Sequence, residues 1–304
     1  MDDPRNSGEI ISVIVPVFNE EESIAKLLQG LQSQIQPLDS FEVLLVDNGS
    51  SDGTLSVVQE FKLQGKLNIR ILQQLNRSSY AARNTGITES LSSHFVVFVD
   101  ADCVPDPGWL INGIHAMENM NADLVGGHVE FKYSDRPSSA EIVDSFTNLQ
   151  MQHGIEVGGY CRTANLFIKR SVLDTIGLFR EVQSGEDIRW TKKATDSGLR
   201  LVFAKDAIVS HPARDWYAMI KKQFRVGIGK NAVLRAQGLS FFGIVRKTLL
   251  SLWIPKWHLV KPRISHLSEN ELKLRKLRIL CALWILRAFT ALGQLFSFLR
   301  LVGK

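Results

Sequence analysis

The sequence predicts an α/β protein with a mostly parallel, doubly wound sheet, followed by a helical and basic C-terminal region. Between residues 10 and 99, β-rich apolar segments alternate four times with segments of helical character, which is typical of parallel sheets with crossover helices. Polar clusters follow three of the predicted strands. After Asp215 the composition changes, because basic residues there far outnumber acidic ones.

The elements follow from hydrophobic periodicity and from turn residues. We predict strands at 10–17, 41–46, 67–72, 95–99, 123–131, 164–169, 201–204 and 207–209. We predict helices that begin after residue 22, at 54 and after the loop at 76, and further helices at 107–120, 139–151, 171–176, 186–195, 216–237 and 271–302.

The strongest local signal is the apolar run 96–99, which ends in Asp100 and Asp102. Carboxylates at the carboxyl end of a buried strand lie where open α/β sheets bind ligands. Mg²⁺ and Mn²⁺ prefer such oxygen ligands together with substrate phosphates. An Asp-x-Asp pair alone also fits an acidic turn. However, the strands that end at Val17 and Val46 lead into polar clusters too, so the set predicts a cation and nucleoside-diphosphate site.

Several classes are disfavoured. The first strand is not followed by G-x-G-x-x-G, and no G-x-x-x-x-G-K-[ST] occurs, which argues against a dinucleotide dehydrogenase and a P-loop NTPase. The three cysteines are widely spaced and suggest neither a disulfide framework nor a zinc site. The acidic first residues do not resemble a signal peptide, so we expect the body to face a reducing cytosol.

Taken in order, the motifs of residues 10–212 resemble the inverting nucleotide-sugar glycosyltransferases of family 2. The segments that carry the resemblance are Val13–Glu20, Val46–Thr54, Ala82–Gly86, Val99–Asp102, Gly185–Asp187 and His211. The resemblance implies a GT-A (Rossmann-like) catalytic domain at 1–214. Residues 215–304 would then form a separate helical region.

The resemblance also implies roles for individual residues. Asp187 would be the general base that deprotonates the acceptor hydroxyl. The ligands of Mg²⁺ or Mn²⁺ would be Asp102, Asp100 and His211. The nucleotide-sugar donor would be bound by Pro16, Asn19, Glu20, Asp47, Asn48, Arg83 and Asp100. Each has a plainer alternative: a turn at Asp47 and Asn48, charges at a helix N-terminus for Asp187, an exposed helix position for Arg83, and a structural histidine at 211.

The implied reaction moves one sugar from a nucleotide donor, with UDP favoured, to a hydroxyl on a lipid-linked or polysaccharide precursor. Processive relatives carry Gln-x-x-Arg-Trp, whereas residues 223–227 lack the Trp, so single transfer is expected. Two departures from the family pattern, Arg180 and Arg189-Trp190, fall on the acceptor side. A nucleotidyltransferase would need a Gly-rich basic loop after the first strand. An inactive scaffold is the other alternative, against which the intact aspartates argue.

The C-terminal region is strongly basic. From Asp215 onward it has seventeen Lys/Arg and three Asp/Glu, a net charge of +14, whereas the preceding residues carry −9. Such a tail favours an anionic lipid surface or nucleic acid. No nucleic-acid recognition motif is apparent, so we expect no nucleic-acid partner.

Residues 279–299 approach transmembrane length, but Arg287 near their middle would cost about 3 kcal/mol in a bilayer. A polar stripe on one helical face, formed by Arg287, Thr290, Gln294 and Ser297, favours a helix lying in the membrane surface. We therefore expect peripheral attachment through 240–304 at the cytoplasmic face. The alternative is that the apolar face packs on the catalytic domain or on a second subunit.

Overall fold

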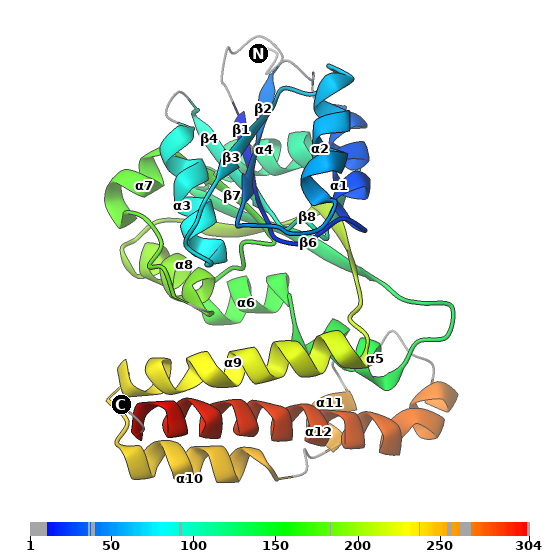
Figure 1. Ribbon diagram of the computed structural model, residues 1–304, viewed down its shortest axis with the longest axis vertical. Helices are drawn as coiled ribbons and strands as arrows, with labels where there is room; N and C mark the ends of the chain where they lie inside the picture. The colour runs from blue at the N-terminus through cyan, green and yellow to red at the C-terminus, as the bar shows by residue number, and fades with distance from the viewer. Residues whose placement is uncertain are drawn as a thin grey trace. The chain divides into compact units, whose positions relative to one another are not determined.

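The computed structural model describes residues 11–35, 37, 40–90, 93–182, 184–236, 238–253, 257–261 and 269–302. The chain divides into two compact units (Figure 1). The first comprises Met1–Phe131 and Leu149–Pro212, and the second comprises Lys132–Asn148 and Ala213–Lys304. Residues 132–148 thus group with the C-terminal helices. The division into domains at 214/215 stays a prediction.

The first unit is built on an eight-stranded sheet with the order β3-β2-β1-β4-β7-β6-β8-β5. The four strands from β3 to β4 are parallel, and β7 then pairs antiparallel with β4 and β6. The predicted α/β class is confirmed. The strands are β1 (Ile11–Val17), β2 (Phe41–Asp47), β3 (Ile69–Gln73), β4 (Phe95–Val99), β5 (Val104–Pro105), β6 (Leu124–Lys132), β7 (Asn165–Lys169) and β8 (Leu201–Pro212).

Helices flank this sheet (Figure 1). They are α1 (Ile24–Gln32), α2 (Thr54–Leu63), α3 (Ser79–Glu89), α4 (Trp109–Asn119), α6 (Met151–Gly158), α7 (Ser171–Ile176) and α8 (Glu186–Asp196). Helix α3 packs on β1 and β2. It approaches closely because Gly86 has no side chain: a Cβ there would lie 2.5 Å from Cγ2 of Ile14. The Ser78 side chain caps its first turn by accepting from the backbone of Tyr80 and Ala81.

The register aligns three strand ends. Val17 is paired with Asp47 at the ends of β1 and β2, and Ile14 is paired with Phe98 near the end of β4. All three strands are apolar and buried almost throughout, as expected for parallel strands covered on both faces. The loops that follow them therefore meet at one edge of the sheet.

Two sequence-based boundaries were wrong. The helix predicted at 139–151 is interrupted, because Leu149 takes a left-handed backbone conformation (φ 48°) between α5 (Ser139–Thr147) and α6. The two short strands predicted at 201–204 and 207–209 form one strand, β8. Lys205 and Asp206 are exposed and continue the strand, so polar side chains there mark a solvent-facing stretch and not a turn.

The second unit is helical. Besides α5 it contains α9 (Trp216–Ala236), α10 (Phe241–Ser251), α11 (Trp257–Val260) and α12 (Glu269–Val302). Within it, α12 lies between α9 and α10 (Figure 1). Helices α9 and α12 run parallel, since Gln223 contacts Thr290 and Asn231 contacts Gln294. Helix α10 runs antiparallel to α12 and contacts it through the edge-to-face rings of Phe241 and Phe298.

Two residues of the predicted polar stripe of α12, Thr290 and Gln294, face α9. Thr290 Oγ1 donates to Gln223 Oε1 over 3.0 Å, and Gln294 Nε2 donates to Asn231 Oδ1 over 3.0 Å. Both partners lie on α9, so these groups hold two helices together. Within the described residues, Arg275–Leu299 is one helical stretch long and apolar enough to cross a bilayer, and 33% of its most apolar part is buried.

The contact between α9 and α12 depends on glycine. A Cβ at Gly293 would collide with the backbone oxygen of Phe224 on α9. We predict that Gly293→Ala lowers the free energy of unfolding by about 2 kcal/mol, because backbone must move to admit the methyl group. Gly243→Ala on α10 is the control, since its nearest neighbours are the side chains of Ser240 and Leu239. Thermal unfolding followed by circular dichroism measures both, and an equal effect would contradict the prediction.

Candidate active site

The loops after β1 and β2 are fixed to each other by reciprocal hydrogen bonds. The Asn19 backbone N–H donates to Ser50 Oγ over 3.0 Å, and Ser51 N–H donates back to Asn19 Oδ1 over 2.8 Å. Asn19 has φ 55°, a conformation that asparagine tolerates well. Beside it, Glu20 N–H donates to Thr54 Oγ1 over 2.8 Å. Asn19 and Glu20 are therefore held at the carboxyl edge of the sheet.

Asp47 and Asn48, at the end of β2, are both buried. Asp47 Oδ1 accepts from the backbone N–H of Ser50, three residues further on, over 3.0 Å. Asn48 Nδ2 donates to the carbonyls of Gln74 and Asn76. Asn48 thus ties β2 to the loop after β3. Pro16, one residue before the end of β1, lies opposite Val46.

Arg83 on α3 is paired with Asp100 at the end of β4. Its Nη2 lies 2.6 Å from Asp100 Oδ1, and its side chain is only 5% exposed. The interpretation of Arg83 as an exposed helix residue is therefore wrong. A buried guanidinium requires an anionic partner, and Asp100 supplies it while keeping part of its own side chain at the surface.

Asp102 is paired with His211 from the far end of β8. His211 Nε2 lies 3.1 Å from Asp102 Oδ2, and the imidazole is fully buried beside the Phe131 ring. The pairing of Val104 with Ser210 brings these two segments together. A carboxylate oxygen and an imidazole nitrogen fit Mg²⁺ or Mn²⁺ when phosphate oxygens complete the coordination. No group of three or more His, Cys, Asp or Glu side chains arranged for a metal occurs among the described residues.

Asp187, at the start of α8, is held from two sides. Tyr80 of α3 donates its O–H to Asp187 Oδ1 over 3.1 Å, and Arg162 Nη1 lies 3.6 Å from Oδ2. The same tyrosine oxygen accepts the backbone N–H of Glu186. Burial, followed by the charge of Asp187, raises the pKa of Tyr80 well above its usual value. The phenol therefore stays protonated and remains a donor at neutral pH.

Helix α3 connects the two groups of site residues. Tyr80 and Arg83 are three positions apart and so share one face of the helix, where the guanidinium lies 5.6 Å from the Tyr80 ring centre. One side chain holds Asp187 and the other holds Asp100. Sequence reasoning missed Tyr80 and Arg162. The spacing between Tyr80 and Arg83 was a usable signal, whereas nothing local pointed from Arg162 to Asp187.

Glu186 differs from its neighbour because its carboxylate is inside the protein and paired with two arginines, Arg180 and Arg189. These are two of the positions at which the sequence departs from the family pattern, and they contact the same carboxylate. Burial favours the neutral acid, but hydrogen bonds from Arg189 and Arg180 outweigh it and hold the pKa of Glu186 below its usual value. Glu186 is thus a structural anchor of α8.

The lowered pKa predicts a specific loss of stability in acid. Ionised Glu186 stabilises the fold above its unfolded-state pKa near 4.5, and this contribution is lost as the pH falls below that value. Glu186→Gln should therefore be less stable than the parent at pH 7 and lose less stability on acidification below pH 4.5. Urea unfolding across this range tests it, with exposed Glu118→Gln as control. Parallel pH curves for parent and Glu186→Gln would contradict it.

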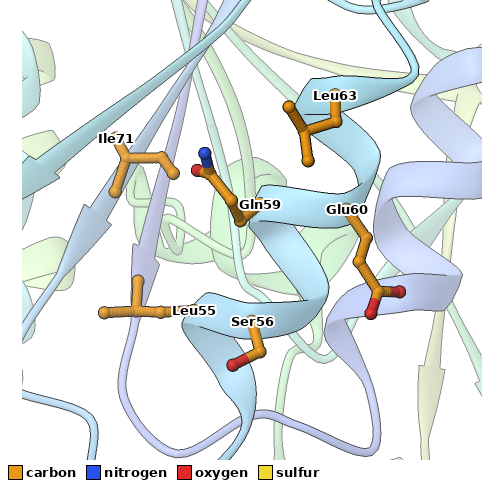
Figure 2. Close-up of a pocket in the computed structure, with 6 residues that line it drawn as sticks. All are labelled: Leu55, Ser56, Gln59, Glu60, Leu63 and Ile71. Atoms are coloured by element: carbon orange, nitrogen blue, oxygen red, sulfur yellow. The ribbon is translucent and has the colours of Figure 1, made fainter.

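A surface pocket lies elsewhere in the first unit (Figure 2). One face of α2 and Ile71 of β3 line it, and the side chains drawn are Leu55, Ser56, Gln59, Glu60, Leu63 and Ile71. None of these is a predicted site residue. With Glu60 as its one charged group, the pocket offers no arrangement for the predicted chemistry.

Comparison with known proteins agrees with the motifs. The family model described as glycosyl transferase family 2 matches residues 12–177. Glycosyltransferase AglE of Haloferax volcanii is 41% identical over 298 residues, covering 95% of this chain and 96% of that protein. A Methanococcus voltae protein named dolichyl N-acetyl-alpha-D-glucosaminyl phosphate 3-beta-D-2,3-diacetamido-2,3-dideoxy-beta-D-glucuronosyltransferase is 26% identical over 240 residues, 74% of each chain.

Solved structures share the fold. The mannosyltransferase PcManGT of Pyrobaculum calidifontis, in complex with GDP-Man and Mn²⁺, superposes with a TM-score of 0.57 at 19% identity, over 96% of this chain and 75% of that one. Residues 1–349 of TarS of Staphylococcus aureus, in complex with UDP-GlcNAc, give 0.53 at 20% identity, over 93% and 89%. The family model and the Haloferax relative together show that this chain belongs to glycosyltransferase family 2, whose members transfer sugars from nucleotide donors.

Proposed function

We propose that this chain is an inverting glycosyltransferase that moves a single sugar from a nucleoside-diphosphate donor to a hydroxyl of a lipid-linked acceptor. The observation that carries the proposal is the pairing of Asp187 with Tyr80, on the same face of α3 as the Arg83–Asp100 pair. One helix thereby supports both a candidate base and a candidate donor ligand.

On the donor side, the nucleotide would lie across the edge formed by β1, β2 and β4. Asp47 would accept a hydrogen bond from the base, and Pro16, Asn19 and Glu20 would line its pocket. Asn48 would shape that pocket through its bonds to the loop after β3. UDP remains the favoured nucleotide, and a UDP-sugar is the donor bound by the TarS relative.

Asp102, with His211, would hold a divalent cation, and Asp100 would reach either that cation or the ribose. When bound, Mg²⁺ or Mn²⁺ neutralises charge that develops on the departing diphosphate. The presence of Mn²⁺ in the PcManGT complex supports this requirement. Arg83 would position Asp100 and add positive charge close to the phosphates.

Asp187 would act as general base. Its carboxylate takes the proton from the acceptor hydroxyl as the acceptor oxygen bonds to the anomeric carbon. The bond from that carbon to the diphosphate oxygen breaks on the opposite side, and the nucleoside diphosphate leaves with the electron pair. A single displacement of this kind inverts the anomeric centre. Tyr80 and Arg162 would keep the carboxylate in place.

The acceptor is inferred from the relatives and from the second unit. The name of the Methanococcus voltae relative gives a dolichyl-phosphate-linked acceptor. The basic and apolar character of 240–304 suits a membrane surface, where such lipids reside. We place the enzyme at the cytoplasmic face, peripheral and not spanning, acting once on each acceptor.

The test is release of nucleoside diphosphate from UDP-, GDP- and dTDP-sugars, with membrane extract as acceptor. We expect turnover of one donor in the parent and a fall in kcat of at least about 100-fold in Asp187→Asn. Asp174→Asn, at an exposed acid of α7, is the matched control. A folded parent that binds no donor would contradict the proposal and favour a scaffold role.

Metal dependence is a separate prediction. EDTA should abolish turnover, Mn²⁺ or Mg²⁺ should restore it, and Asp102→Asn should require much more cation for half-maximal rate. The reason is that Asp102 would supply the direct oxygen ligand. Full activity after exhaustive chelation, or a cation requirement unchanged in Asp102→Asn, would remove the metal from the mechanism.

Tyr80 is predicted to be a positioning residue. Tyr80→Phe deletes the hydroxyl that holds Asp187 and keeps the ring that packs on Phe179. We expect kcat to fall by about tenfold while the donor KM stays within error of the parent. The melting temperature should also fall, because the Glu186 N–H loses its acceptor. A loss confined to stability, with kcat unchanged, would show that the hydroxyl has only a structural role.

A further inference from the structure

The described part of α12 exposes large apolar side chains along one face. They recur at intervals of three or four residues or at sums of these, which places them on a single side of a helix. Neighbouring α10 exposes a similar set. We call these residues the outer face: Phe242, Leu249 and Leu250 on α10, Trp253 just after the end of α10, and Leu277, Trp284, Leu292, Leu295 and Leu299 on α12.

The two parts of the outer face belong to helices in direct contact. Arg287 of α12 donates from Nη1 to the Trp253 carbonyl over 3.0 Å, and the Phe241 and Phe298 rings meet edge to face with centres 5.0 Å apart. The polar groups Thr290 and Gln294 are turned toward α9. Because Thr290 and Gln294 are occupied inside the unit, the side chains that α12 exposes between Trp284 and Leu299 are apolar.

Charge identifies the kind of partner. Residues 241–253 and 275–299 contain no Asp or Glu, but they contain Arg246, Lys247, Arg275, Lys276, Arg278 and Arg287. Two copies meeting through this face would bring like charges together, which is costly. A surface of anionic lipid would satisfy both the apolar side chains and the cations.

Spanning is unfavourable for this arrangement. Helix α9 runs beside α12 and carries Lys221, Lys222, Arg225, Lys230 and Arg235. Inserting α12 across a bilayer in this packing would carry α9 with it and place several of these charges in hydrocarbon, each at a cost of roughly 3 kcal/mol. If α9, α10 and α12 lie together in the membrane–water interface, the cations of α9 stay near the lipid headgroups.

We propose that the outer face of α10 and α12 docks this enzyme onto an anionic lipid surface. This rests on the proposed function in one respect only, that the acceptor is carried by a lipid. Docking would keep the enzyme on the surface that holds its acceptor.

The test is flotation of the full-length protein with vesicles of phosphatidylcholine alone or mixed with equal parts of phosphatidylglycerol. We expect binding to the mixed vesicles, weakened by salt. The variant Phe242→Ser/Leu250→Ser/Trp253→Ser should lose at least about tenfold in binding. The matched control Leu63→Ser/Leu75→Ser/Val157→Ser, at equally exposed positions of the first unit, should bind like the parent.

A second pair of variants tests the charges. Arg246→Gln/Lys247→Gln should lose the preference for phosphatidylglycerol, and Lys62→Gln/Lys66→Gln, also exposed, should keep it. Undiminished flotation of the serine variant would overturn the proposal. So would a parent that is dimeric by light scattering and becomes monomeric in that variant, because a second copy would then be the occupant. UDP binding by the same samples separates this result from the fate of the proposed function.

Discussion

The buried ion pair between Arg83 and Asp100 is the contact on which the candidate site depends. A guanidinium withdrawn from water is tolerated only beside an anion, and Asp100 meets it from the end of β4. The pair fixes α3 against the sheet, and Gly86 lets the same helix lie close to Ile14. Tyr80, one turn away from Arg83, is thereby set against Asp187.

This dependence links regions that are distant in the chain. Asp187 lies in the first turn of α8, whereas Asp47 ends β2 and Asp100 directly follows β4. Helix α3 contacts both regions, because Tyr80 binds Asp187 and Arg83 binds Asp100. Glu186 adds a separate anchor, since its two arginines hold the first turn of α8 without engaging Asp187.

Much of the first unit was predictable because its signals are local. Apolar runs that end in polar residues predicted the parallel strands. The positions of those ends identified Asp47, Asp100 and Asp102 as candidate site residues. Long-range contacts were not predictable in this way. Arg162, and the junction of Asp102 with His211 through the pairing of β5 with β8, depend on how distant segments meet. The interruption between α5 and α6 depends on the left-handed backbone conformation of Leu149, which a leucine side chain does not predict.

The second unit shows the limit of helical periodicity most clearly. Thr290 and Gln294 share a face, and periodicity alone cannot tell whether water or another helix meets that face. In the structure α9 meets it, so the side chains left exposed between Trp284 and Leu299 are apolar. The net positive charge of the region still favours an anionic lipid surface, because that charge is the same whichever face of α12 contacts α9.

The most direct measurement of the mechanism is the anomeric configuration of the glycosidic bond in the product, determined by proton NMR. A single displacement by an acceptor that Asp187 deprotonates gives a glycosidic bond of configuration opposite to that of the donor. Retention of the donor's configuration would require a different sequence of steps and would contradict the role assigned to Asp187.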